Sequence, residues 1–146
     1  MTKPIAGGLN LITIANGNSQ KLRYIIEQKD NVAHLIVEVS APVRGEPYTI
    51  IKRPKSQPSL FTDFPLIGSH NFAFPCIINS HLFWPNEERS SVNLVQSSRS
   101  KINREIVERS VLLLQKMIRV ASNQKWGGIG TLLNIKLPGL VDENWY

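Results

Sequence analysis

The sequence predicts an α+β domain in which an antiparallel or mixed sheet carries one long helix packed on one face. Residues 9–53 hold four runs rich in β-branched residues, separated by turn signals. Residues 101–123 repeat apolar side chains at the spacing of an amphipathic helix. Between them, residues 60–89 concentrate aromatic side chains and carry prolines, which interrupt strand pairing. We expect residues 1–146 to form a single domain, since this length is enough to bury a core.

The first two predicted strands form a hairpin. Residues 9–15 are rich in β-branched side chains, which favours a strand. The segment Asn16-Gly17-Asn18-Ser19 follows, and Asn-Gly is a strong signal for a two-residue hairpin turn. Residues 21–28 then form the return strand.

A third strand is predicted over residues 32–39. One face of it is wholly apolar and should lie toward the core; its members are Ala33, Leu35, Val37 and Val39. A fourth strand is predicted over residues 48–53, after a loop with two prolines and a glycine. Short turns between the first three strands favour an antiparallel meander.

Residues 60–89 are the stretch around which the chain is organised. They hold all five phenylalanines, three of the nine prolines and the only cysteine. We expect a crossing segment of short extended pieces that places aromatic side chains in the core. Phe74, Pro75 and Cys76 begin a predicted buried strand that ends at Asn79, and Cys76 should be a buried, unreactive thiol. A charged turn over residues 85–89 follows.

The long helix is predicted from residue 101 to about 123, with Ser98 or Ser100 as its N-cap. Its apolar stripe is widened by residues on either side; the stripe comprises Ile102, Ile106, Leu113, Met117 and Val120, widened by Val107, Val111, Leu114, Ile118 and Ala121. Glu105 and Arg109 are spaced as a favourable i,i+4 pair. The glycines after Trp126 are expected to stop the helix, and residues 131–137 to form a short strand or helical turn.

Composition limits the class of protein. A net charge of +6 permits binding to nucleic acid or phosphates, but the cations are spread along the chain, which favours a solvated basic surface. No apolar run approaches the ~20 residues of a membrane span, and the N-terminus lacks a convincing cleavage site, so we expect no membrane contact and a cytoplasmic location. The aromatic end at Trp145 and Tyr146 favours a fragment of a longer protein.

Sequence motifs for a self-sufficient active site are missing. The chain has no Gly-x-Ser-x-Gly elbow, no His-Glu-x-x-His pair and no Walker loop. The sequence Gly127-Gly128-Ile129-Gly130 lacks the Gly-Lys-Ser/Thr that a phosphate loop needs. We therefore expect no enzyme activity from this chain alone.

Residues 60–90 resemble a region that follows the ATPase domain in proteins of the GHKL superfamily, which includes gyrase B, the histidine kinases, the ninety-kilodalton heat-shock chaperone and sacsin-like proteins. The residues that carry the resemblance are Phe61, Asp63-Phe64-Pro65-Leu66-Ile67-Gly68, Phe72-Ala73-Phe74-Pro75, Asn79, Phe83, Pro85 and Glu88-Arg89. The ATP-site motifs of the superfamily are not present here.

The resemblance implies a second, coupling domain of an ATP-binding protein, with a layout similar to ribosomal protein S5. ATP and Mg²⁺ would be bound by the adjacent ATPase domain and not by this chain. The implied partners are that domain and a protein client. In the superfamily a basic residue of the following domain reaches the terminal phosphate. Arg89 is the matching candidate for this auxiliary role in catalysis, because a stabilising cation is needed where charge develops on phosphate oxygens.

Other interpretations remain open at each of these positions. Arg89 could form a local ion pair with Glu87 or Glu88. Asn79 and Asp63 could each bond turn amides. The aromatic side chains favour core packing, with any exposed ones forming an interface patch; they are Phe61, Phe64, Phe72, Phe74, Phe83 and Trp84. For the whole chain, the alternatives are a basic nucleic-acid-binding module and a protein–protein docking domain.

Overall fold

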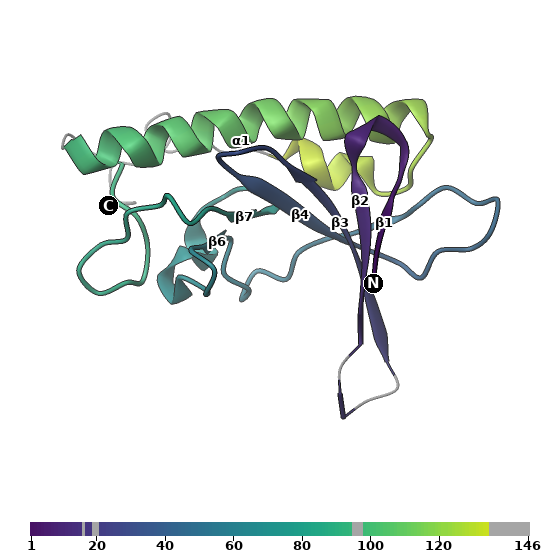
Figure 1. Cartoon of the computed structure of the whole chain (residues 1–146), viewed down its shortest axis with the longest axis horizontal. Coiled ribbons are helices and arrows are strands. Elements are labelled where there is room, and N and C mark those ends of the chain that lie inside the picture. The colour runs from purple at the N-terminus through teal and green to yellow at the C-terminus, as the bar shows by residue number, and fades with distance from the viewer. Residues whose placement is uncertain (16, 19–20, 95–97, 135–146) are drawn as a thin grey trace.

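A twisted sheet with one long helix lying along it makes up the chain (Figure 1). The computed structural model describes residues 1–15, 17–18, 21–94 and 98–134. The α+β prediction is confirmed: the sheet is mixed, and the long helix packs against it. The predicted turn at 16–19 lies partly outside the described residues, and the aromatic end lies wholly outside them.

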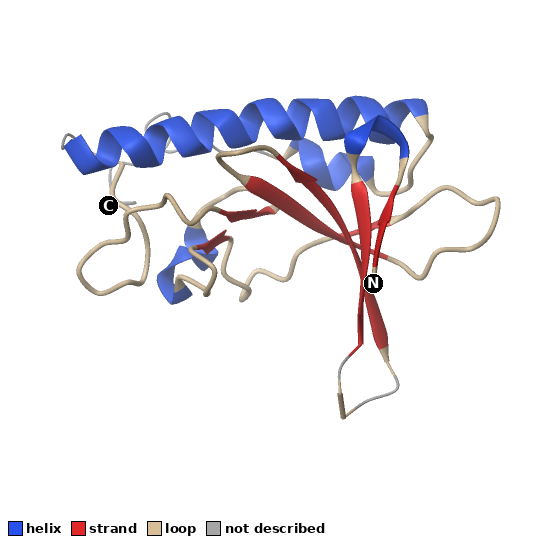
Figure 2. Cartoon of the chain, viewed as in Figure 1, coloured by secondary structure: helices blue, strands red, loops and turns tan. Residues whose placement is uncertain are grey.

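Seven strands form the sheet in the order β1-β2-β3-β4-β7-β6, and β5 also pairs with β4. Their bounds are β1 Thr2–Pro4, β2 Asn10–Ala15, β3 Leu22–Lys29, β4 His34–Val39, β5 Ile50–Ile51, β6 Leu60–Phe61 and β7 Ile77–Asn79. Neighbours are antiparallel except β6 and β7, which are parallel. The helices are α1 Ser98–Asn123 and three 3₁₀ segments: η1 Ala6–Gly8, η2 Ile67–Asn71 and η3 Ile129–Leu133 (Figure 2).

The sheet has one buried face and one largely open face. Leu11, Ile26 and Val37 lie opposite one another on β2, β3 and β4, and all three are buried. The predicted apolar face of β4 is confirmed, because Ala33, Leu35, Val37 and Val39 are all buried. This face packs with the apolar side of α1, whose Ile106, Leu114 and Met117 are almost wholly buried.

Two strand predictions were too long. The predicted strand at 48–53 is reduced to Ile50–Ile51, because Tyr48 and Thr49 pair instead with Gly127 after the helix. The predicted strand from Phe74 is reduced to Ile77–Asn79. Pro75 has no N–H to donate to a ladder, which explains why pairing begins after it.

Helix α1 starts before the predicted residue, and its buried stripe is rotated from the predicted one. Ser100 lies inside the helix and is not the predicted N-cap, whereas Ser98 is the first helical residue and borders residues outside the described ranges. Ile102 is exposed, whereas Asn103 is fully buried. At 3.6 residues per turn, Asn103 falls near the middle of the stripe and Ile102 about 100° away at its edge.

Arg109 on α1 pairs with Asp30 in the loop before β4, and not with Glu105 as predicted. Two backbone amides, from Val32 and Ala33, also donate to the Asp30 carboxylate at 2.7 and 2.9 Å. Burial raises the pKa of Asp30, but the Arg109 hydrogen bond and these amides outweigh it, so the pKa is lowered overall.

The end of α1 is set by Lys125 and not by the glycines that were predicted to stop it. Lys125 adopts a left-handed conformation (φ 56°). The amide of Trp126 donates to the Ala121 carbonyl at 2.9 Å, and the amide of Lys125 donates to the Ser122 carbonyl at 3.1 Å. This is the Schellman pattern, here closed by the buried Trp126 side chain.

Among the described residues, no helix is long and apolar enough to cross a membrane.

Candidate functional site

The charged turn at 85–92, which we call the Arg89 turn, is closed by its own hydrogen bonds. Pro85 and Val92 form an isolated antiparallel bridge. The amide of Arg89 donates to the Asn86 carbonyl at 2.9 Å, and the Asn86 amide donates to the Ser91 carbonyl at 2.8 Å. The Asn86 side chain also accepts from the Ser90 amide at 2.9 Å. The position of the backbone at Arg89 is therefore well determined by local contacts.

Arg89 itself is exposed and has a left-handed backbone (φ 53°). That conformation costs a non-glycine residue about 1–2 kcal/mol, which the surrounding bonds must offset. Within the described part of the chain, Arg89 forms no ion pair with Glu87, Glu88 or any other carboxylate. The local ion pair considered from the sequence is thus not formed, and the guanidinium faces solvent.

A hollow of about 510 Å³ borders the Arg89 turn. Arg89, Arg99 and His81 supply its basic groups, while the exposed rings of Phe64 and Trp84 supply its apolar surface. The Arg99 guanidinium lies 4.6 Å from the Trp84 ring centroid, a cation–π contact. We call this hollow the Trp84 groove. It presents two guanidinium groups beside an aromatic platform.

Asn103 joins the Trp84 groove to helix α1. Its Oδ1 accepts from the Trp84 amide at 2.8 Å, and its Nδ2 donates to the carbonyls of Trp84 and Asn93 at 2.9 and 3.0 Å. A buried amide must satisfy its polar atoms, and Asn103 does so on both sides of the Arg89 turn. The turn is therefore tied directly to the helix.

Asp63 and Asn79 are brought together on one edge of the sheet. The Asp63 amide donates to Asn79 Oδ1 at 2.9 Å, and Asn79 Nδ2 donates to the Asp63 carboxylate at 3.4 Å. Asp63 has a positive φ of 66°. These contacts give both residues a structural role, since they hold the turn that presents Phe64.

The other residues singled out in the segment at 60–90 divide between core and surface. Phe74 is buried and stacks on Phe72 with ring centroids 5.9 Å apart. Phe64 and Trp84 are 44% and 48% exposed, so core packing was the wrong expectation for these two. Pro65 is exposed and forms an isolated antiparallel β-bridge with Phe61, whose side chain is only partly buried.

Pro75 is half-buried, and Glu88 is exposed on the Arg89 turn. Cys76 is almost wholly buried. Burial raises the pKa of its thiol to about 12, although the neighbouring Arg53 acts in the opposite direction. Cys76 is therefore a packing residue, as predicted, because its thiol is not ionised near neutral pH.

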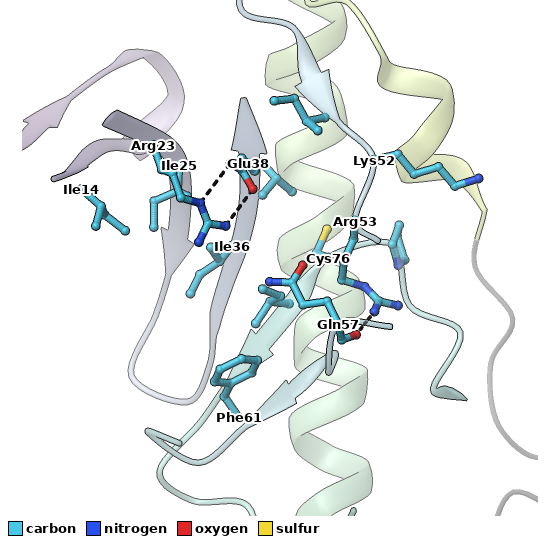
Figure 3. Close-up of a pocket in the computed structure, with 14 residues that line it drawn as sticks. Ile14, Arg23, Ile25, Ile36, Glu38, Lys52, Arg53, Gln57, Phe61 and Cys76 are labelled. Atoms are coloured by element: carbon cyan, nitrogen blue, oxygen red, sulfur yellow. Dashed lines mark hydrogen bonds and ion pairs between the residues drawn. The ribbon is translucent and has the colours of Figure 1, made fainter. Parts of the chain in front are cut away.

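The open face of the sheet is a second candidate surface, which we call the isoleucine face. It carries Ile14 and Ile51, which are 41% and 45% exposed, and the half-buried Ile25 and Ile36. At its centre, Arg23 and Glu38 form two hydrogen bonds of 3.1 and 2.8 Å (Figure 3). The isoleucines around this pair form an apolar patch, as is common for surfaces that contact another protein, and the polar pair Glu27 and His34 lies further along the same face.

Sequence reasoning missed Arg99 and Asn103. Arg99 lies before the predicted start of the helix at residue 101, and Asn103 was given no role. A polar residue at the centre of a helical stripe could have indicated a buried hydrogen-bond partner.

No group of three or more His, Cys, Asp or Glu side chains that could hold a metal ion is found in the described ranges. Comparisons with protein-family models, with curated proteins and with solved structures find no match to this chain.

Proposed function

We propose that this chain is the non-catalytic coupling domain of a GHKL-like ATPase. In this proposal Arg89 senses the terminal phosphate of a nucleotide bound in an adjacent ATPase domain. Contact between Arg89 and the phosphate then changes the conformation of the rest of the chain or its binding to a partner. The proposal rests on the family-like residues at 60–90 together with the geometry around Arg89.

The observation that carries the proposal is a guanidinium that faces solvent from a fixed backbone. The Arg89 turn is closed by local hydrogen bonds, and Arg89 has no carboxylate partner in the described ranges. A cation that only stabilises the fold would gain from an ion pair with a carboxylate of its own chain. A cation that binds a phosphate must be free of such a pair. Asn103 gives the turn a rigid connection to α1, through which a contact at Arg89 can be transmitted.

ATP and Mg²⁺ would be held by the adjacent domain, where the metal neutralises the phosphates. This chain would add one positive charge at the point where negative charge develops as the terminal bond breaks. Arg99 lines the same groove as Arg89 and raises the local positive potential. Its contact with Trp84 holds it in place.

The test compares Arg89→Ala, Arg89→Lys and Arg44→Ala in a protein that contains this chain and its ATPase domain. Removal of one stabilising donor lowers kcat by roughly 100-fold, so we expect a loss of that order for Arg89→Ala, with nucleotide affinity nearly unchanged. Arg89→Lys should restore part of the rate. Arg44 is also exposed and serves as the control for a lost surface charge. An unchanged rate in Arg89→Ala would remove the coupling role.

A second candidate function is binding to single-stranded nucleic acid. Trp84 presents an exposed ring beside Arg99 and Arg89, and base stacking on aromatic side chains next to cations is typical of such sites. Affinity for an oligonucleotide should then fall steeply with salt and should be lost in Trp84→Ala. Binding that does not respond to Trp84→Ala would count against this function.

Protein docking through the isoleucine face is the third candidate. Its exposed Ile14 and Ile51 form an apolar surface that another domain could cover. The change Ile51→Lys should weaken association with such a domain while leaving ATP turnover per active complex unchanged. If association with the ATPase domain withstands Ile51→Lys, this face is not the docking surface.

A further inference from the structure

We infer a second anion-binding site, separate from Arg89, in a pocket that takes a phosphate-bearing small molecule. The pocket has a volume of about 400 Å³ and shares no lining residue with the Trp84 groove. Its basic side chains are Lys52, Arg53, Lys55 and His70. We call it the basic pocket.

Three separate segments build the basic pocket. The stretch after β5 supplies Lys52, Arg53 and Lys55, and the end of η2 supplies His70. Thr131 of η3 lies on the third side. Three of the four basic side chains come from the short run at 52–55, and the fold adds His70 and Thr131 from two other segments.

The lining of the basic pocket is entirely free of carboxylates, unlike that of the Trp84 groove, which includes Glu87. Its other members are Asn71, Ala73, Phe74, Pro75 and Asn134. Within the described residues, no ion pair is formed by any of the four basic side chains of the pocket, which are Lys52, Arg53, Lys55 and His70. The positive charge of this pocket therefore has no internal counterion in that part of the chain.

Arg53 is the fixed member of the set. Its guanidinium donates to the backbone carbonyls of Gln57 and Phe74, the latter at 3.4 Å. Figure 3 shows the Lys52 side chain directed away from the Arg23–Glu38 pair, while Arg53 also lines the pocket on the isoleucine face. Burial lowers the pKa of Arg53, and no carboxylate acts against that effect. A partly desolvated charge without a counterion is costly, and a bound anion would relieve that cost.

The chemistry of the pocket favours phosphate over carboxylate ligands. Guanidinium offers a planar set of donors that matches phosphate oxygens, and lysine adds a mobile point charge. The volume exceeds that of one phosphate group and lies in the range of small-molecule sites. Phosphate esters or pyrophosphate fit this description, with the apolar surface of Ala73 and Pro75 beside the charged groups.

The experiment titrates the full chain with pyrophosphate by isothermal calorimetry at low ionic strength. We expect saturable binding with one site, weakened about tenfold in the double variant Lys52→Gln/Lys55→Gln, which loses two solvent-exposed ion pairs with the ligand. The matched control is Lys3→Gln/Lys116→Gln, which removes the same charge from exposed lysines outside the pocket. Arg53→Lys, which keeps the charge but loses the planar fork, should also weaken binding.

Equal weakening in the two double variants would overturn the site, because it would show only a response to net charge. The absence of saturable binding at millimolar pyrophosphate would also overturn it. The lysines tested are exposed, so their loss should not prevent folding; circular dichroism checks this.

Discussion

Replacement of Asn103 tests whether the Arg89 turn is held to the helix as the structure indicates. Asn103→Ala removes three hydrogen bonds, one from the Trp84 amide and two to the carbonyls of Trp84 and Asn93. At about 1 kcal/mol net for each bond, the loss is about 3 kcal/mol. Alanine is the better helix former and returns about 0.5 kcal/mol. We therefore expect the free energy of unfolding to fall by roughly 2–3 kcal/mol.

The assay is urea denaturation followed by circular dichroism, with Gln115→Ala as the control on the exposed side of the same helix. Surface changes of that kind are usually within about 0.5 kcal/mol of the parent protein. If Asn103→Ala costs no more than Gln115→Ala, the three bonds do not contribute to stability, and the proposed link between α1 and the Arg89 turn is wrong.

Asn103→Asp gives an independent check through pH. The new carboxylate could still accept from the Trp84 amide but would face two carbonyl oxygens that need donors. Its folded-state pKa should be raised above the unfolded value of about 3.9. Relative to the parent protein, the variant should then be least destabilised below about pH 4, and the difference should grow as pH rises through the raised pKa. A variant that is equally stable at pH 4 and pH 7, relative to the parent, would contradict this reasoning.

Two further predictions concern stability. Gly128→Ala should destabilise the fold by about 2 kcal/mol or more, because φ is 74° and the new Cβ would lie 2.5 Å from the Ile50 carbonyl oxygen; Gly130→Ala, with no atom within 4 Å, is the control in the same denaturation assay. In the Asp30→Asn variant, the free energy of unfolding should fall less steeply with decreasing pH in the acid range than it does in the parent protein. The lowered pKa of Asp30 contributes stability above its unfolded pKa of about 3.9, and this is lost as pH falls. A parallel pair of acid-unfolding curves would show that the ionised Asp30, with its contacts to Arg109 and to the Val32 and Ala33 amides, does not contribute to stability.

Local periodicity explains which elements could be predicted. The strand at 32–39 alternates apolar and mixed positions, and the helix repeats at 3.6 residues, so both were recognised from the sequence. Strands of two or three residues, such as β6 Leu60–Phe61, are too short to show a period. Their pairing depends on the partner strand, and β6 is defined only by lying parallel to β7.

The candidate site was predicted in part. The Arg89 turn was located from its charged residues and the family-like pattern. Its partners could not be predicted, because Arg99 and Asn103 belong to α1 and reach the turn only when the helix packs beside it. Asn79 was expected to bond turn amides, and it does so, because its Oδ1 accepts from the Asp63 amide. Asp63 was also expected to bond backbone amides, but its carboxylate accepts from the Asn79 side chain.

The sequence by itself determined the class of fold, the long helix and the absence of ATP-site motifs, because these follow from composition and from spacing between near neighbours. Only the tertiary structure decided which cations lack a counterion. It placed Arg53 beside His70 and left Arg89 facing solvent. The physical reason is that electrostatic energy depends on distances in space, and residues from separate segments acquire those distances only when the chain folds.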